Sequence, residues 1–178
     1  MSGHNKWSQI KHKKGITDAK KSKIFSKLVK YIAVEARLSG GKDSPGLRSA
    51  IEKAKKVNMP SENIERAIKK AGESGTHMDA ITYEAYGPGG VGIIIETLTD
   101  SKNRTAQEIK HILSKNGFAL GGIGSVVWAF QKEMSPHGLI YVPNTTTPIS
   151  DEDIEALDKL VEELENDDDV QEVYTNAE

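Results

Sequence analysis

The sequence predicts an α+β protein, with an N-terminal three-helix basic domain followed by an α/β sandwich domain that has a mostly antiparallel sheet. Apolar residues recur at helical spacing up to residue 72, whereas short β-branched runs alternate with single helical segments from residue 81 onward. Charge changes in the same region. Residues 1–72 hold eighteen Lys/Arg and six Asp/Glu, a net charge of +12, while residues 73–178 hold six and twenty, a net charge of −14. Two modules with separate electrostatic roles are therefore expected.

Three helices are expected in the basic domain, residues 1–72, after an extended arm formed by residues 1–16. Capping and helix-breaking residues bound them: Thr17 or Asp18 to Gly40 and Gly41, Ser44 and Pro45 to about Val57, and about Pro60 to Gly72. The lysines fall outside the apolar positions of these helices. One surface of the domain should therefore be strongly positive.

Residues 73–80 are expected to be a linker, and residues 81–178 the α+β domain. The expected strands are 83–86, 91–99, 125–131, 139–142 and 170–175. Two helices are expected between them, one over 103–116 with Asn103 as N-cap and Gly117 as C-cap, and one that follows the N-cap Ser150. Single helices between strands favour a sheet with its helices on one face.

Several kinds of chemistry are disfavoured by what the sequence lacks. Without cysteine there are no disulfides, thiolate nucleophiles or Cys-based zinc sites. The five histidines show no H-x-x-x-H pair, and neither a G-x-S-x-G nor a G-K-[ST] motif occurs. We therefore expect no enzyme, no metal and no cofactor. No secretory signal or membrane-spanning run is visible, so no membrane contact is expected. The chain is further expected to be a monomer.

The strongest functional signal is the N-terminal run of lysines. Residues 1–34 hold nine lysines and one acid, Asp18. Such skew favours contact with a phosphate backbone over a mixed solvated face, and lysines hold phosphates as point charges that carry no sequence information. Trp7 either stacks on a base or anchors the arm to the domain. The predicted nucleic-acid-binding residues are Lys6, Trp7, Lys11, His12, Lys13, Lys14, Lys20, Lys21, Lys23, Lys27 and Lys30.

Two other segments have alternative interpretations. Lys102, Asn103 and Arg104 follow a buried strand and either cap a helix or make a secondary contact with an anionic partner. Residues 151–178 hold thirteen acids and one lysine, which indicates a solvated face or an electrostatic mimic that competes for the basic arm. The stretch 87–92 matches G-x-G-x-x-G, but β-branched residues follow it, which favours a glycine-rich turn over a dinucleotide site.

The motifs resemble the YebC family over nearly the whole chain. The matching segments are GHNKWSQIKHKK at 3–14, KIFSKL at 23–28, YEAYGPGG at 83–90, DSKNRT at 100–105 and DDVQEVY at 168–174. The resemblance implies a non-enzymatic, cytoplasmic regulator of gene expression, described for this family as a probable transcriptional regulator that binds DNA. Other members are similar to translation factors that act on the ribosome, so ribosomal RNA is the alternative target.

One departure from the family pattern concerns residues 131–138. Family members carry a third α/β domain inserted there, and here the short connection QKEMSPHG replaces it. The remaining alternative for the whole chain is a protein-interaction module that docks acidic partners. The sequence therefore predicts a nucleic-acid-binding regulator and leaves DNA, ribosomal RNA and acidic proteins as candidate partners.

Overall fold

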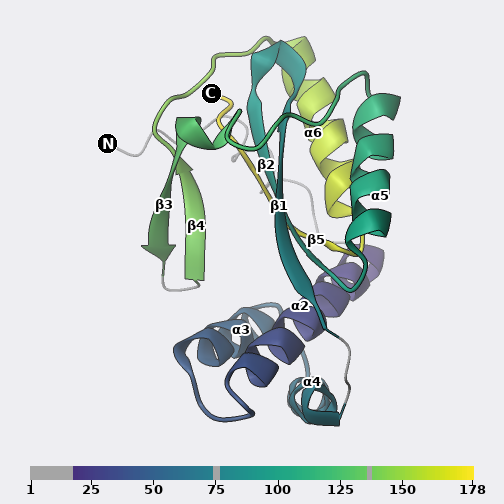
Figure 1. The fold of residues 1–178 in the computed structure, drawn as a ribbon, viewed down its shortest axis with the longest axis vertical. Helices are drawn as coiled ribbons and strands as arrows, with labels where there is room; N and C mark the ends of the chain where they lie inside the picture. The colour runs from purple at the N-terminus through teal and green to yellow at the C-terminus, as the bar shows by residue number, and fades with distance from the viewer. Residues whose placement is uncertain (1–17, 74–76, 136–137) are drawn as a thin grey trace. The chain divides into compact units, whose positions relative to one another are not determined.

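The computed structural model describes residues 18–73, 77–135 and 138–178 (Figure 1). Their fold is α+β, as predicted, with a helical part followed by antiparallel sheets. They divide into two compact units. The described residues of 18–78 and 133–140 form one, and residues 79–132 and 141–178 form the other. The finer division into 1–72, a linker 73–80 and 81–178 stays a prediction.

The helical unit contains α2 (Asp18–Leu38), α3 (Pro45–Lys56) and α4 (Ser61–Glu73). Helix α2 packs against both of the others. Ile32 and Ala36 of α2 are buried among apolar residues of α3 and α4, and these are mostly alanines, which let helix backbones approach closely. All three expected helices are present, although α4 ends at Glu73 instead of Gly72.

Two short connections join these helices. After α2, Gly40 and Gly41 adopt positive φ angles of 62° and 75°, which stop the helix. Ser44 then caps α3, because its side-chain oxygen accepts a hydrogen bond from the Leu47 N–H at 3.1 Å. At the other end of α3, Asn58 has a φ of 59° and the Met59 N–H donates to the Ala54 carbonyl. This is a Schellman-type end with buried Met59 as its apolar contact.

The second unit is built on a three-stranded antiparallel sheet in the order β1-β2-β5. Its strands are β1 (Asp79–Tyr86), β2 (Gly92–Thr99) and β5 (Val170–Thr175), and β1 begins four residues before the strand expected at 83. Central strand β2 is buried on both faces. Ile95 of β2 lies opposite Tyr83 on one side and Val173 on the other, which fixes the register.

Helices α5 (Lys102–Lys115) and α6 (Asp151–Glu165) cover one face of this sheet (Figure 1). Ile93 and Ile95 pack against the apolar positions of both helices in the largest core of the protein. Ser150 caps α6 by accepting from the Asp153 N–H, as predicted. The C-cap of α5 is Asn116 and not Gly117 as expected, and Gly117, with a φ of 86°, is the next residue. Helix α5 starts after Ser101, so the expectation that Asn103 is the N-cap is wrong.

A second, two-stranded sheet lies on the opposite side of β2 (Figure 1). It consists of β3 (Phe130–Ser135) and β4 (Gly138–Pro143), whose Phe130 and Tyr141 pack with Ile94 in a smaller core. The strand expected over 125–131 is wrong, because Val127–Ala129 form a 3-10 turn, η2. Of the expected strand, only residues 130 and 131 belong to β3.

The glycine-rich segment between β1 and β2 is a turn, as the sequence favours. Pro88–Gly90 form a short 3-10 helix, η1, and Gly89 has a φ of 65°. A Cβ atom on Gly87 would lie 2.7 Å from Cδ1 of Ile93, in the core. Nearby, the Asn176 side chain accepts the Gly92 N–H at 2.8 Å and donates to the Thr145 carbonyl at 3.0 Å, which joins the end of β5 to the start of β2. Packing and turn geometry account for these glycines.

The loop between α5 and β3 is held by a buried carboxylate, Glu84 of β1. Its Oε1 accepts the Gly124 N–H at 2.6 Å, and its Oε2 accepts the N–H groups of Val126 and Val127 at 2.6 and 2.8 Å. Burial raises the pKa of this carboxyl, but the three backbone hydrogen bonds together lower it by more than burial raises it. The pKa of Glu84 is therefore lowered. The same N–H groups are unavailable to a sheet, which explains why 125–129 is not a strand.

None of the helices in the described part of the chain has the length and apolar content needed to span a bilayer.

We expect Asn58→Ala to lower the free energy of unfolding by about 1 kcal/mol, because a Cβ-bearing residue without a local polar group tolerates the left-handed region poorly. Asn58→Gly should leave it unchanged or slightly higher. Urea denaturation of both variants, followed by circular dichroism, measures the difference. Equal stability of the two variants would show that the left-handed backbone at this helix end is not a constraint.

We expect Glu84→Gln to cost about 2 kcal/mol at pH 7, since charge-assisted bonds to backbone N–H groups are lost. The folded pKa of Glu84 is lowered, so its stabilisation is present above the unfolded value of about 4.5 and is lost as pH falls through the folded value. The gap between wild type and variant should therefore shrink at pH 3. Glu155→Gln, at an exposed position on α6, is the control and should cost under about 0.5 kcal/mol at pH 7.

Candidate nucleic-acid interface

A stripe of lysines runs along α2 at positions 20, 23, 27 and 30, separated by three, four and three residues. At about 100° per residue, these four positions fall within one sector of about 80° of the helix surface. Ile32 and Ala36, which are buried in the helical core, lie on the opposite side of the same helix. The helical spacing therefore places these four lysine positions in a row along the first half of α2, and we call them the α2 lysine stripe.

The structure describes only some of the predicted site residues. Lys6, Trp7, Lys11, His12, Lys13 and Lys14 lie outside the described residues, as does the side chain of Lys20. Lys21 and Lys23 are exposed near the start of α2, and Lys27 and Lys30 are half-buried. Lys21 points away from the stripe by its helical position. Half-buried lysines keep their ammonium groups near solvent while their stems cover apolar surface.

Further basic residues lie on α3 and α4. Lys55, Lys56, Lys69 and Lys70 are exposed, and the Lys53 Nζ lies 5.1 Å from the centre of the Tyr31 ring. Lysines in the last turn of a helix also complement its negative end, so part of this charge stabilises the helices themselves. These residues extend the positive character of the helical unit beyond α2.

A shallow open hollow of about 480 Å³ lies within the helical unit, where α2 and α4 end. Among the described residues, Arg37 and His77 are the ionisable ones that line it, and glycines and alanines make up most of the rest. Two helices direct their C-terminal, partly negative ends toward this region, which does not favour an anion. The hollow brings together no nucleophile, base and carboxylate that would make a catalytic site.

The predicted secondary contact, residues 102–104, lies at the start of α5, and two of its three side chains form ion pairs with carboxylates. Lys102 pairs with Asp79 at 3.2 Å. The Arg104 guanidinium donates to Asp169 at 2.7 Å and to Asp100 at 2.9 Å, and these partners raise its pKa. Asn103 is exposed. A phosphate contact by Arg104 would have to compete with these intramolecular partners, so residues 102–104 first serve to anchor the helix.

Asp169 is the centre of this network, and the sequence did not reveal it. Its side chain is only 4% exposed, and its Oδ2 accepts from the hydroxyls of Thr99 and Thr105 at 3.0 and 2.7 Å as well as from Arg104. Its own carbonyl accepts the Leu98 N–H at 2.8 Å. The network thereby ties the turn before β5 to the end of β2 and the start of α5. Three aspartates follow one another at 167–169, and no local pattern distinguishes the buried one.

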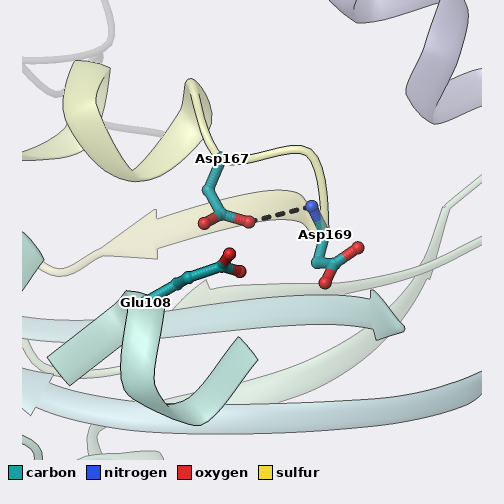
Figure 2. A group of neighbouring side chains, drawn as sticks. All are labelled: Glu108, Asp167 and Asp169. Atoms are coloured by element: carbon teal, nitrogen blue, oxygen red, sulfur yellow. Dashed lines mark hydrogen bonds between the residues drawn. The ribbon is translucent and has the colours of Figure 1, made fainter. Parts of the chain in front are cut away.

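Asp169 also belongs to a group of three acids with Asp167 and Glu108, shown in Figure 2. Their carboxylate oxygens lie within 4.8 Å of one another, and the Asp169 N–H donates to Asp167 at 2.9 Å. Partial burial, and then the charge of Asp167, raise the pKa of Glu108, while Arg104 lowers it. The guanidinium of Arg104 supplies the positive charge that this group needs, so hydrogen bonding within the fold accounts for the arrangement.

Comparison with known proteins identifies the family. Residues 5–74 match the model of the TACO1/YebC protein N-terminal domain, and residues 78–135 and 131–177 match that of the TACO1/YebC second and third domain. The chain belongs to the TACO1/YebC family. This confirms the resemblance drawn from the sequence motifs, and the matched segments together cover nearly all of the chain.

Relatives in this family are named as regulators. A probable transcriptional regulatory protein of Petrotoga mobilis is 50% identical over 165 residues, and these cover 90% of this chain and 61% of that protein. One of Fervidobacterium nodosum is 40% identical over 235 residues, covering 99% and 93%. The crystal structure of a conserved hypothetical protein from Aquifex aeolicus matches with a TM-score of 0.83 and 34% identity, covering 97% and 96% of the two chains.

The chain is shorter than the Petrotoga and Fervidobacterium proteins. It spans 61% of the Petrotoga protein, and the 235-position match to the Fervidobacterium protein exceeds its 178 residues by 57. The two segments that match the second and third domain meet at residues 131–135, in β3. That a third domain is replaced by a short connection near 131–138 stays a prediction.

We expect Asp169→Ala to lower the free energy of unfolding by about 3 kcal/mol, because two buried hydroxyls and a guanidinium lose their shared acceptor. Asp168→Ala, at the exposed neighbouring position, should cost under about 0.5 kcal/mol. Urea denaturation of both variants measures the contrast. Equal destabilisation by the two variants would show that the charge of the 167–169 turn matters, and not the specific bonds of Asp169.

Proposed function

We propose that this protein is a monomeric, non-enzymatic regulator of gene expression that acts in the cytoplasm and binds DNA through its N-terminal arm and the α2 lysine stripe. The observation that carries the proposal is the stripe at 20, 23, 27 and 30, which continues the lysines of the arm. Residues 1–34 hold nine lysines and one acid. A helix face of this kind matches the charge of a phosphate backbone.

The choice of DNA rests on the relatives, which are named probable transcriptional regulatory proteins. Lysines contact phosphates and carry no base information, so binding through the stripe is expected to be largely independent of sequence. The second unit, residues 79–132 and 141–178, carries six Lys/Arg against eighteen Asp/Glu, a net charge of −12. Such a unit is repelled by a polyanion, which favours approach of DNA to the helical unit alone.

Structured RNA, ribosomal RNA above all, is the second candidate, because the same lysine geometry suits any dense row of phosphates. A translation factor with this target would use the same residues. The two functions are separated by the nucleic acid recovered from cells. Crosslinking followed by sequencing should recover DNA if the proposal is correct, whereas recovery of ribosomal RNA at one location would replace transcription by translation as the function.

We expect glutamine at all four stripe positions, Lys20, Lys23, Lys27 and Lys30, to weaken binding of a 30-base-pair DNA duplex by about tenfold or more. The plot of log Kd against log salt concentration should become shallower by about 0.9 for each phosphate that the variant no longer binds. Fluorescence anisotropy at several salt concentrations measures both quantities. Glutamine at all nine lysines of residues 1–34 should remove measurable binding at 150 mM salt.

The matched control removes the same charge from the second unit, with glutamine at Lys110, Lys115, Lys132 and Lys159. If binding depends on the α2 stripe, this control should change the Kd by less than about twofold. If both quadruple variants weaken binding equally, the net charge of the protein determines binding and the position of the α2 lysine stripe does not. Unchanged binding by the nine-lysine variant would refute it.

A further inference from the structure

An exposed apolar patch lies on the second unit, on the loop that Glu84 holds. Ile123 is fully exposed, Trp128 is 61% exposed and Tyr86 of β1 is 42% exposed. The Tyr86 hydroxyl and the Trp128 Nε1–H both donate to the Ser125 carbonyl, at 2.6 and 2.7 Å, so these two side chains meet over the same loop. We call Ile123, Trp128 and Tyr86 the loop patch. Large exposed apolar side chains on one loop and on the strand bonded to it indicate an interaction surface.

The loop patch is held rigidly. Three N–H groups of the loop are bound by the buried carboxylate of Glu84, and the Gly121 N–H donates to the Glu84 carbonyl at 2.7 Å. Gly124 adopts a φ of 86°, which sets the turn between Ile123 and Ser125. A partner would therefore meet a surface that loses little conformational freedom on binding, which increases affinity.

The polar atoms of the patch are already satisfied within the protein. Because the Tyr86 hydroxyl and the indole N–H bind Ser125, the groups left for a partner are an aliphatic side chain and the exposed parts of two rings. Residues 116–131 contain no charged residue. The patch is thus suited to an apolar recess on the partner, and Trp and Tyr are the side chains that most often dominate such contacts.

Charge selects the class of partner. The unit that carries the patch has a net charge of −12 over residues 79–132 and 141–178. This charge disfavours a nucleic acid, and it also disfavours a second copy of the same unit, because each would bring like charge to the interface. A protein with an apolar recess surrounded by basic residues is complementary to both features.

We infer that the loop patch is a docking site for a basic protein, with Ile123 and Trp128 inserted into an apolar recess whose rim is positive. Basic proteins often bind nucleic acids, so such a partner would itself bind the polyanion that the helical unit binds. Two linked contacts raise overall affinity by effective concentration, without any new contact in either site. The inference does not require that the helical unit bind DNA.

The test begins with site-specific photo-crosslinking in the native host. Benzoylphenylalanine replaces Ile123 in the full chain, and in the control it replaces Glu155, an exposed residue of α6. Adducts are treated with nuclease and the attached protein is identified by mass spectrometry. A protein of net positive charge, attached from position 123 and not from 155, is the expected result.

The identified protein is then purified and its Kd for the full chain is measured by fluorescence anisotropy. Ile123→Ser should raise the Kd about tenfold or more, and Trp128→Ser should do the same. Leu38→Ser removes a similarly exposed apolar side chain, 77% exposed, from the helical unit and should change the Kd by less than about twofold. Since Ile123 is fully exposed, its replacement should leave the circular dichroism spectrum unchanged, which separates a docking defect from a folding defect.

Several results would overturn the inference. A nuclease-sensitive adduct would assign the patch to nucleic acid, an adduct of two chains to a dimer, and a link to residues 1–17 to the chain's own arm. An acidic partner, no specific adduct, or an unchanged Kd for Ile123→Ser would also refute it.

Discussion

Strand β2 is buried on both of its faces, and the rest of the second unit is arranged to keep it so. Ile93 and Ile95 face α5 and α6, while Ile94 faces Phe130 and Tyr141 of the β3–β4 sheet. Successive side chains of a strand point to opposite sides, so three consecutive isoleucines need two separate covers. A slip of one residue would exchange the two sets. The hydrogen bonds that the Gly92 N–H donates to the Asn176 side chain and the Leu98 N–H donates to the Asp169 carbonyl oppose such a slip at the two ends.

The order of helices and strands could be predicted because most of their boundaries depend on local chemistry. Ser44, Ser150 and the glycines after α2 and α5 act through their own backbone or through residues three or four positions away. The error in the strand expected over 125–131 arose because a distant side chain decides the local structure. Residues 125–131 have a strand-like composition, but a carboxylate about forty positions earlier binds their N–H groups. Asn103 has the chemistry of a cap, yet Ser101 occupies that position.

The same distinction applies to the candidate sites. The α2 lysine stripe could be predicted from the sequence, because residues spaced by three, four and three positions lie on one face of a helix. Asp169 was not visible, because its role depends on Thr99, Thr105 and Arg104, which lie on other elements. The loop patch depends on Glu84 in the same way. The lysine stripe therefore needs only a helix to form, whereas the loop patch forms only after the second unit has folded.

The pairing of β2 with β5 has a consequence for the order of folding. Ile95 lies opposite Val173, across 78 positions of sequence, whereas all three helices of the helical unit precede β1 in the chain. Chains are synthesised from the N-terminus and domains fold as units, and contacts distant in sequence form slowly. On a growing chain, the lysine-rich helices therefore mature while the sheet still lacks its third strand. The positive charge of these helices is therefore present on the growing chain before most of the acidic residues of 79–178 have been added.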